Sequence, residues 1–436
     1  PGKTLTINHA SAINHDRLRL YGAFTNDANL VLNNGGVWMA PYVASGTQQY
    51  NGLISGSGGF VNRAGGSTII FNNTNIFTGD ARITTGGYGI GVDSVVSGGT
   101  MVSSPLGLGS LVLTNESDGV GGNGALIALN GPRILANPIA YSRSNEFTLI
   151  IAGTNDLTLS GGIACAGQLD GLAASRTLQV DNTGVTRITA PVQAPVGTYV
   201  YKTGAGTLLL NSSNTYGGGF VVSNGVFGGT GSLNAVLGIA PGATLSPGDN
   251  SIGKFTVNNG VSCAGTLLIE IDKNNPNTND SLFVTGSIGA GASTTVVVTN
   301  LGPALVAGNS FKLANVPVSS GDLATITPAP GAGLVWTNLL AVNGSIAVIS
   351  TNAGPSIPTT PTNLVFAASG GNLNFSWPSN YIGWTLQVQT NLRSVGLVPA
   401  TNAWFDVAGS TTTNQAQIPV SSAAPTVFYR LFYRIP

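Results

Sequence analysis

The stretch from Val200 to Phe227, VYKTGAGTLLLNSSNTYGGGFVVSNGVF, limits most strongly what this chain can fold into. It holds two short apolar strands, Thr207 to Leu210 and Phe220 to Ser223, separated by a polar corner and a run of glycines. An Asn224-Gly225 turn follows the second strand. Strands this short, set between Gly, Asn and Ser corners, cannot bury a face alone, so such units must stack on one another. The stretch therefore predicts one coil of a β-solenoid.

The same residues resemble the autotransporter-associated β-strand repeat, whose pattern is typically K-x-G-x-G-T-L-x-L-x-x-x-N-T-Y-x-G-x-T-x-V-x-x-G. Phe220 departs from the pattern, which usually has Thr at that place. The resemblance implies an exported, bacterial cell-surface protein of the passenger type. The residues that fall in register are Lys202, Gly204, Gly206, Thr207, Leu208, Leu210, Asn214, Thr215, Tyr216, Gly218, Val222 and Gly225.

A second, more divergent copy of the unit lies at Phe60 to Ile83, FVNRAGGSTIIFNNTNIFTGDARI. The two copies are 139 positions apart (207 minus 68). That distance predicts roughly seven coils between them if each coil takes ~20 residues. The alignment pairs Thr68 with Thr207, Phe71 with Leu210, Asn75 with Asn214, Phe77 with Tyr216 and Gly79 with Gly218.

Charged side chains are scarce, at 7% of the 436 residues against ~25% in an average globular protein, and the formal net charge is zero. Because 42% of the residues are hydrophobic, the chain is expected to fold rather than stay disordered. Nucleic-acid binding needs a positively charged stripe, and no basic cluster is present, so no nucleic-acid partner is expected. The apolar runs are far shorter than the ~20 residues of a membrane-spanning helix, so no membrane span is expected. The chain begins at Pro1 without Met, which indicates a signal peptide that is removed or not included.

Cys165 and Cys263 are the two cysteines, 98 positions apart (263 minus 165). This is about five coils at ~20 residues each, or ~24 Å along a continuous solenoid with strands ~4.8 Å apart. A disulfide needs Cα atoms within ~7 Å, so the spacing favours two buried free thiols. The alternatives are a chain that doubles back and a bond between chains.

The solenoid is predicted over residues 1–245, where no stretch keeps a helical apolar period. Apolar strands such as Phe147 to Ala152 favour a parallel, right-handed β-helix buried on both sides. Its Asn-rich corners are expected to form hydrogen-bonded ladders. A segment within Ala240 to Lys254 resembles the L-x-P-G-x-S-x-G sequence that follows such repeats. Residues 246–350 are therefore interpreted as the C-terminal part of the solenoid or its cap.

Residues 351–362, TNAGPSIPTTPT, are Pro-rich and predict an extended linker. Residues 363–436 hold three of the five tryptophans but few glycines, which indicates a separate domain with an aromatic core. Six strand-like runs there predict a small antiparallel β-sandwich. In style it resembles the fibronectin-III-like modules of secreted bacterial proteins.

Candidates for chemistry are few. His9 and His15, the latter beside Asp16, are interpreted as corner residues, because no G-x-S-x-G elbow accompanies them. Glu270 and Asp272 alternate on one strand before the oxygen-rich loop Lys273 to Asp280, so Glu270, Asp272 and Asp280 are weak candidates for Ca²⁺. A polar hairpin with an outward acidic pair is the favoured alternative. Polysaccharide lyases also use β-helices, but fold analogy alone does not support catalysis here.

On the last strand, Phe428, Arg430, Phe432 and Arg434 alternate onto one face. The simpler interpretation is arginine stacked over aromatic rings on an exposed sheet face. The alternative interpretation is a surface for docking or for glycan contact.

The function expected from these observations is that of a non-enzymatic extracellular structural protein. A bare coil at a solenoid end is a template for another chain, and Lys3, Leu5 and Ile7 form the first predicted strand. We therefore predict head-to-tail assembly into a surface fibre, between that strand and the Phe428 to Arg434 region. The alternatives are a monomeric adhesin that binds surface glycans and, less favoured, a polysaccharide lyase.

Overall fold

The structure is a computed structural model that describes residues 2–8, 17–33, 38–41, 46–114, 122–141, 147–165, 175–195, 197–215, 218–351, 358–421 and 426–434. The chain divides into two compact units, Pro1–Ser350 and Thr351–Pro436. His9, His15, Asp16 and Tyr216 lie outside the described residues.

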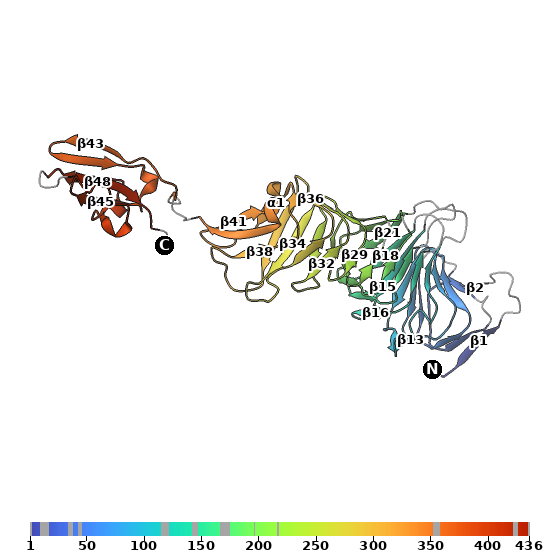
Figure 1. Cartoon of the computed structure of the whole chain (residues 1–436). Coiled ribbons are helices and arrows are strands. Elements are labelled where there is room, and N and C mark those ends of the chain that lie inside the picture. Colours follow the sequence, from blue (N-terminus) through green and yellow to red (C-terminus); the bar gives the residue numbers. More distant parts are fainter. Residues whose placement is uncertain are drawn as a thin grey trace. The chain divides into compact units, whose positions relative to one another are not determined.

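The first unit is a parallel β-solenoid, as predicted. Each coil contributes a strand to a long face, and most coils also contribute one to a second face and one to a third, so strands of successive coils lie side by side (Figure 1). The long face is a continuous 13-stranded parallel sheet. Its strands are β3 (Phe24–Asn26), β6 (Gly46–Tyr50), β9 (Ser67–Phe71), β11 (Gly87–Ile90), β15 (Asn123–Ala128), β18 (Thr148–Ala152), β21 (Ser175–Val180), β24 (Tyr199–Thr203), β27 (Gly219–Val222), β30 (Val236–Ile239), β33 (Val261–Cys263), β36 (Ile288–Ala290) and β39 (Val318–Ser319).

The second face consists of a 3-stranded and a 9-stranded sheet, both parallel. Its strands are β1 (Thr4–Asn8), β4 (Asn29–Asn33) and β7 (Ile54–Gly56), then β16 (Arg133–Leu135), β19 (Leu157–Leu159), β22 (Val185–Ile188), β25 (Thr207–Leu210), β28 (Val226–Gly229), β31 (Thr244–Pro247), β34 (Thr266–Ile271), β37 (Thr295–Asn300) and β40 (Thr325–Thr327).

The third face consists of an 8-stranded and a 4-stranded parallel sheet, joined by a bridge between Gln193 and Thr215. Its strands are β2 (Arg17–Leu20), β5 (Trp38–Pro41), β8 (Gly59–Asn62), β10 (Ala81–Ile83), β14 (Leu111–Leu113), β17 (Ile139–Tyr141), β20 (Ile163–Cys165) and β23 (Val192–Gln193), then β26 (Ser213–Asn214), β29 (Ser232–Leu233), β32 (Lys254–Val257) and β35 (Ser281–Val284).

Coil length varies widely. Register partners on the long face are 17 positions apart between Phe220 and Leu237 (237 minus 220) and 38 apart between Gly87 and Ala125 (125 minus 87). The longest coil carries an inserted antiparallel hairpin of β12 (Val95–Ser97) and β13 (Thr100–Ser103). A parallel sheet tolerates this variation because only the strands must stay in register, while loops absorb extra residues.

The alignment of the two sequence copies is corrected by this geometry. Thr68 lies on β9 of the long face, whereas Thr207 lies on β25 of the second face. Between them the long face advances by five strands, from β9 to β24, and not by the seven coils that the sequence predicted. The estimate was wrong because most coils in this interval are longer than ~20 residues.

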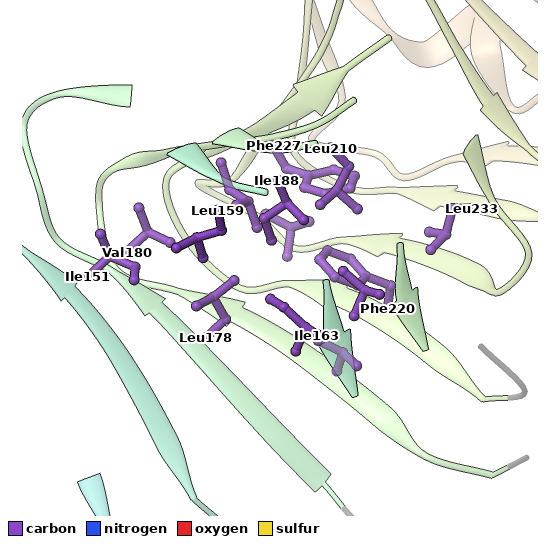
Figure 2. Close-up of a cluster of buried hydrophobic side chains, with 14 of the residues drawn as sticks. Ile151, Leu159, Ile163, Leu178, Val180, Ile188, Leu210, Phe220, Phe227 and Leu233 are labelled. Carbon is purple, nitrogen blue, oxygen red and sulfur yellow. The ribbon is translucent and has the colours of Figure 1, made fainter. Parts of the chain in front are cut away.

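The core is a column of inward side chains along the solenoid axis. Strands alternate buried and half-exposed residues, as in β9 and β21, so every second side chain points inward. Within the segment from Val200 to Phe227, the centroids of the Phe220 and Phe227 rings lie 4.6 Å apart (Figure 2). The Phe at 220 thus fills the interior where the repeat pattern has Thr.

Cys165, on β20, and Cys263, on β33, are both buried free thiols, as predicted. Burial raises the pKa of the Cys165 thiol to about 12. Since the thiolate is the reactive form, such a thiol is inert near neutral pH.

Asparagine ladders run along the corners, as predicted. Asn72 Nδ2 donates to Asn51 Oδ1 at 2.8 Å, and Asn51 Nδ2 donates to Asp27 Oδ1 at 2.7 Å, which links three successive coils. A further amide pair joins Asn258 to Asn234 at 2.7 Å. Each ladder repeats at the coil spacing, so polar corners reinforce the register that the strands set.

The solenoid ends in a small antiparallel cap. Strands β38 (Ser310–Lys312), β42 (Ser345–Ser350) and β41 (Leu334–Leu339) form a 3-stranded sheet in that order. The helix α1 (Leu340–Asn343) and the 3-10 helix η1 (Gly321–Leu323) contact each other beside it, and α1 also contacts β39. Leu340 is buried and joins the core, so the last coil is covered.

The second unit is all-β, as predicted, with two 3-stranded antiparallel sheets. Phe375, Trp377 and Leu386 form its core, with Tyr429 and Leu431 packed against them. The sheets are β43 (Val365–Ser369), β44 (Asn372–Ser376) and β47 (Gln415–Pro419), and β46 (Phe405–Asp406), β45 (Thr385–Asn391) and β48 (Thr426–Phe432), with 3-10 helices η2 (Ser379–Tyr381), η3 (Thr401–Ala403) and η4 (Ser410–Thr412).

Candidate functional site

Lys202 is a charged residue whose side chain occupies an inward position of the solenoid. Its register neighbours on the adjacent coils are Leu178 and Val222, and Lys202 itself is fully buried. The Nζ atom donates to the carbonyl oxygens of Gly204, Gly206 and Asn224 at 2.6, 2.7 and 2.8 Å. All three ammonium protons are thereby used.

The Lys202 corner, made of Lys202, Gly204, Gly206, Asn224 and Gly225, explains the spacing of the repeat motif. Gly204 and Gly225 have φ angles of 76° and 71°, which favour glycine. A methyl group on Gly225 would come within 2.4 Å of Lys202 Nζ. Burial lowers the pKa of Lys202 to about 8, although Asp181 opposes this. We conclude that Lys202 has a structural role, because its ammonium joins the backbones of two adjacent coils.

The Asp280 corner is a second buried charge, of opposite sign. Asp280 is fully buried, and its Oδ1 and Oδ2 atoms accept hydrogen bonds from the backbone N–H groups of Gly253 and Glu270, both at 2.8 Å. Burial raises the pKa of Asp280 to about 7, with a smaller contribution from the charge of Glu270 in the same direction, although both backbone donors favour the ionised form. The carboxylate ties β32 to β34 of the next coil.

Glu270, Asp272 and Asp280 are not arranged as a calcium-binding site. Asp272 Oδ1 accepts from the N–H of Asn274, and Asp280 is bonded as described above. The loop closes as a polar hairpin, with an antiparallel bridge between Ile271 and Asn279. Within the described ranges, no group of three or more His, Cys, Asp and Glu side chains is arranged to hold a metal ion.

A polar hollow of about 570 Å³ lies beside this hairpin, and sequence reasoning missed it. It is lined by Gly253 and Lys254, by residues 276–279, and by Ser281 and Lys312. Lys254 is the register partner of Ser281 on the next coil. The lysines are 58 positions apart (312 minus 254), so only coil stacking brings them to one site.

The first predicted assembly strand is β1, which contains Leu5 and Ile7 and follows Lys3. It pairs in parallel with β4 and with no other strand in the described part of the chain. Leu5 is 53% exposed, whereas Ile7 is half-buried and packs against the core. Within the described residues, β1 is therefore the outermost strand of its sheet.

The second predicted assembly region lies on β48, which is also at the edge of its described sheet. Arg430 pairs with Gln387 of β45, and its Nε donates to Gln387 Oε1 at 2.9 Å. The guanidinium lies 4.3 Å from the centre of the Trp404 ring and 5.0 Å from that of Phe432. Arginine thus stacks on aromatic rings on this half-exposed face, which is the simpler of the two interpretations.

Phe428 and Arg434 extend the same face. Phe428 pairs with Gln389 of β45, and Arg434 Nη2 forms an ion pair with Asp406 Oδ2 at 2.8 Å. Asp406 Oδ1 in turn accepts from Gln387 Nε2 at 2.7 Å. Arg430, Phe432 and Arg434 therefore belong to one polar and aromatic network, and Phe428 lies on the same strand.

Comparison with known proteins leaves the family open: no family model and no curated protein matches this chain. In the described residues, none of the helices is both long and apolar enough to cross a membrane.

Proposed function

We propose that this protein is an extracellular structural protein that assembles with itself head to tail into a surface fibre. The observation that supports this is the position of the two predicted contact regions. Both β1 and β48 are edge strands, each bonded on one side within the described residues. An edge strand presents a row of free N–H and C=O groups that can pair with another chain.

The two ends of the solenoid differ, which favours a fibre over a closed dimer. At one end β1, β2 and β3 are the first described strands of parallel sheets, and at the other the antiparallel cap and α1 cover the last coil. A contact between two different surfaces is heterologous, and it propagates openly when its rotation does not close. A net charge of zero also weakens repulsion between copies. Export is what the resemblance to the autotransporter-associated repeat implies.

The experiment is sedimentation and electron microscopy of the intact chain and of Leu5→Lys. A lysine on an edge strand blocks pairing, and Leu5 is exposed enough for the change to leave the coil folded. We expect long assemblies from the parent chain and monomers from Leu5→Lys. The matched control is Val236→Lys, at an exposed position within the long face. A parent chain that stays monomeric at high concentration contradicts the proposal.

The second candidate is a monomeric adhesin that contacts glycans through the outer face of β45 and β48. Supporting it, the Trp404 and Phe432 rings and the Arg430 guanidinium lie together on a half-exposed surface. Binding of the intact protein to a glycan array, lost in Trp404→Ala, would favour this candidate over the fibre.

A further inference from the structure

The polar hollow beside the hairpin at residues 272–280 has the dimensions of a ligand site. Its volume of about 570 Å³ lies within the range of ~300–1,000 Å³ that is usual for small-molecule pockets. Its lining comes from two successive coils and from the cap: Lys254 opens β32, Ser281 opens β35, and Lys312 ends β38 of the cap. Asn279 Nδ2 donates to the Lys312 carbonyl at 2.8 Å, which holds the hairpin against β38.

The hollow is positively charged although the chain as a whole is neutral. Its lining contains two lysines and no carboxylate. Lys312 Nζ donates one hydrogen bond to the Asn343 carbonyl, so two of its three ammonium protons remain for a ligand. Lys254 lies on β32, which pairs with β35, and Lys312 lies two residues before Ala314, which bridges to Leu282 on the other side of β35. The Asp280 carboxylate, bonded to the Gly253 N–H at the edge of the hollow, is buried and does not line it. Two cations in one concave site concentrate an anionic ligand.

The remaining groups suit a sugar. The side chains of Asn277 and Ser281 line the hollow and make no hydrogen bond within the described residues, so an amide and a hydroxyl are available to ligand hydroxyls. Phe283 does not line the hollow itself, but it lies two residues after Ser281 on the same side of β35 and is 42% exposed. Lys254 Nζ lies 5.8 Å from the centre of that ring. An aromatic face beside free polar groups can stack against the C–H face of a sugar ring.

We infer that the hollow binds an acidic oligosaccharide whose sugar rings carry carboxylates. Lys254 and Lys312 pair with carboxylates on the ligand, Asn277 and Ser281 bond its hydroxyls, and Phe283 packs on one ring. This binding site on the solenoid is separate from the strand edges and does not depend on fibre formation.

The test is calorimetric titration of the whole chain with a trisaccharide of galacturonic acid and with galactotriose, its neutral counterpart. We expect saturable binding of the acidic trisaccharide and at least about tenfold weaker binding of the neutral one. Raising the salt to about 1 M weakens the acidic complex, because exposed charges are then screened within ~3 Å.

Three variants assign the binding to the hollow. Lys254→Gln with Lys312→Gln weakens binding about tenfold or more, and Lys254→Gln alone gives a smaller loss. Lys273→Gln is the control, because its ammonium donates to the Ala304 carbonyl and does not line the hollow. Equal melting temperatures establish that the variants fold. The inference is overturned if neither trisaccharide binds, if both bind equally, if the double variant binds as the parent does, or if inorganic phosphate binds as tightly as the acidic trisaccharide.

Discussion

The Lys202 corner and the Asp280 corner solve the same problem with opposite charges. At the first, an ammonium donates to three backbone carbonyls, and at the second, a carboxylate accepts from two backbone amides. Both side chains are fully buried and join segments of adjacent coils. The turns of a β-solenoid contain backbone groups that make no hydrogen bond between strands. A buried ammonium bonds such groups where they are carbonyls, and a buried carboxylate bonds them where they are N–H groups.

The two corners differ in how local their partners are. Lys202 bonds to Gly204 and Gly206 on its own turn, and only Asn224 comes from the next coil. Asp280 bonds to Glu270 across the hairpin and to Gly253, 27 positions earlier. A motif in the sequence can therefore record the first corner, whereas the second has no local pattern.

The largest effect is expected from Lys202→Met. It leaves the carbonyls of Gly204 and Asn224 without their Lys202 donor and the Gly206 carbonyl with only the Val226 N–H, and we expect the free energy of unfolding to fall by about 3–5 kcal/mol. Urea denaturation followed by circular dichroism measures this. Lys273→Met, with an exposed ammonium, is the control and should change stability by less than about 0.5 kcal/mol. Equal effects of the two variants would show that the hydrogen bonds of Lys202 do not stabilise the fold.

A smaller loss is expected from Asp280→Asn. The amide keeps one acceptor and turns its NH₂ group toward the N–H of either Gly253 or Glu270, so one backbone donor stays unsatisfied. We expect a loss of about 1–3 kcal/mol in the same denaturation assay. Asp272→Asn keeps the oxygen that accepts from Asn274 and serves as the control. Stability unchanged by Asp280→Asn would contradict the proposed role of this carboxylate.

The corners also predict opposite pH dependence. The pKa of Asp280 is raised from 3.8 to about 7, so the folded state binds the extra proton and stability falls as pH rises from about 4 to 7. The pKa of Lys202 is lowered from 10.5 to about 8, so the unfolded state binds the extra proton and stability rises between about pH 8 and 10. Each slope is at most about 1.4 kcal/mol per pH unit.

Melting curves across pH test this pair of slopes. Asp280→Asn should flatten the acidic window and leave the basic one, and Lys202→Met should do the reverse. The contribution of each corner is the slope of stability against pH in the parent chain minus that in the variant. Two contributions of the same sign would contradict the opposite pH dependence of the corners.

The smallest effect is expected at a solvent-exposed corner. Asn51→Ala removes the middle amide of the ladder from Asp27 to Asn72, where water can replace the lost partners. We expect a loss of about 0.5–1.5 kcal/mol. Asn277→Ala, whose side chain makes no bond in the described residues, is the control for an exposed loop amide. A loss as large as that of Lys202→Met would mean that burial does not separate the two kinds of corner.

The sequence by itself determined the parts that depend on neighbouring residues. Short apolar strands between Gly and Asn corners predicted the parallel solenoid, and the strands after residue 363 predicted the antiparallel unit. The asparagine corners predicted ladders, and Arg430 was correctly placed on a face with Phe432. These features follow from the alternation of side chains along a strand and from turn chemistry, which are local.

Only the tertiary structure decided which residues of different coils become neighbours. Thr68 and Thr207 share a local pattern but occupy different faces, because loop lengths set the coil spacing and vary between 17 and 38 positions. The same freedom makes Asp280 a backbone acceptor and places Lys254 and Lys312 in one hollow. Stacking register depends on the sum of all preceding loops, so no short stretch of sequence can specify it.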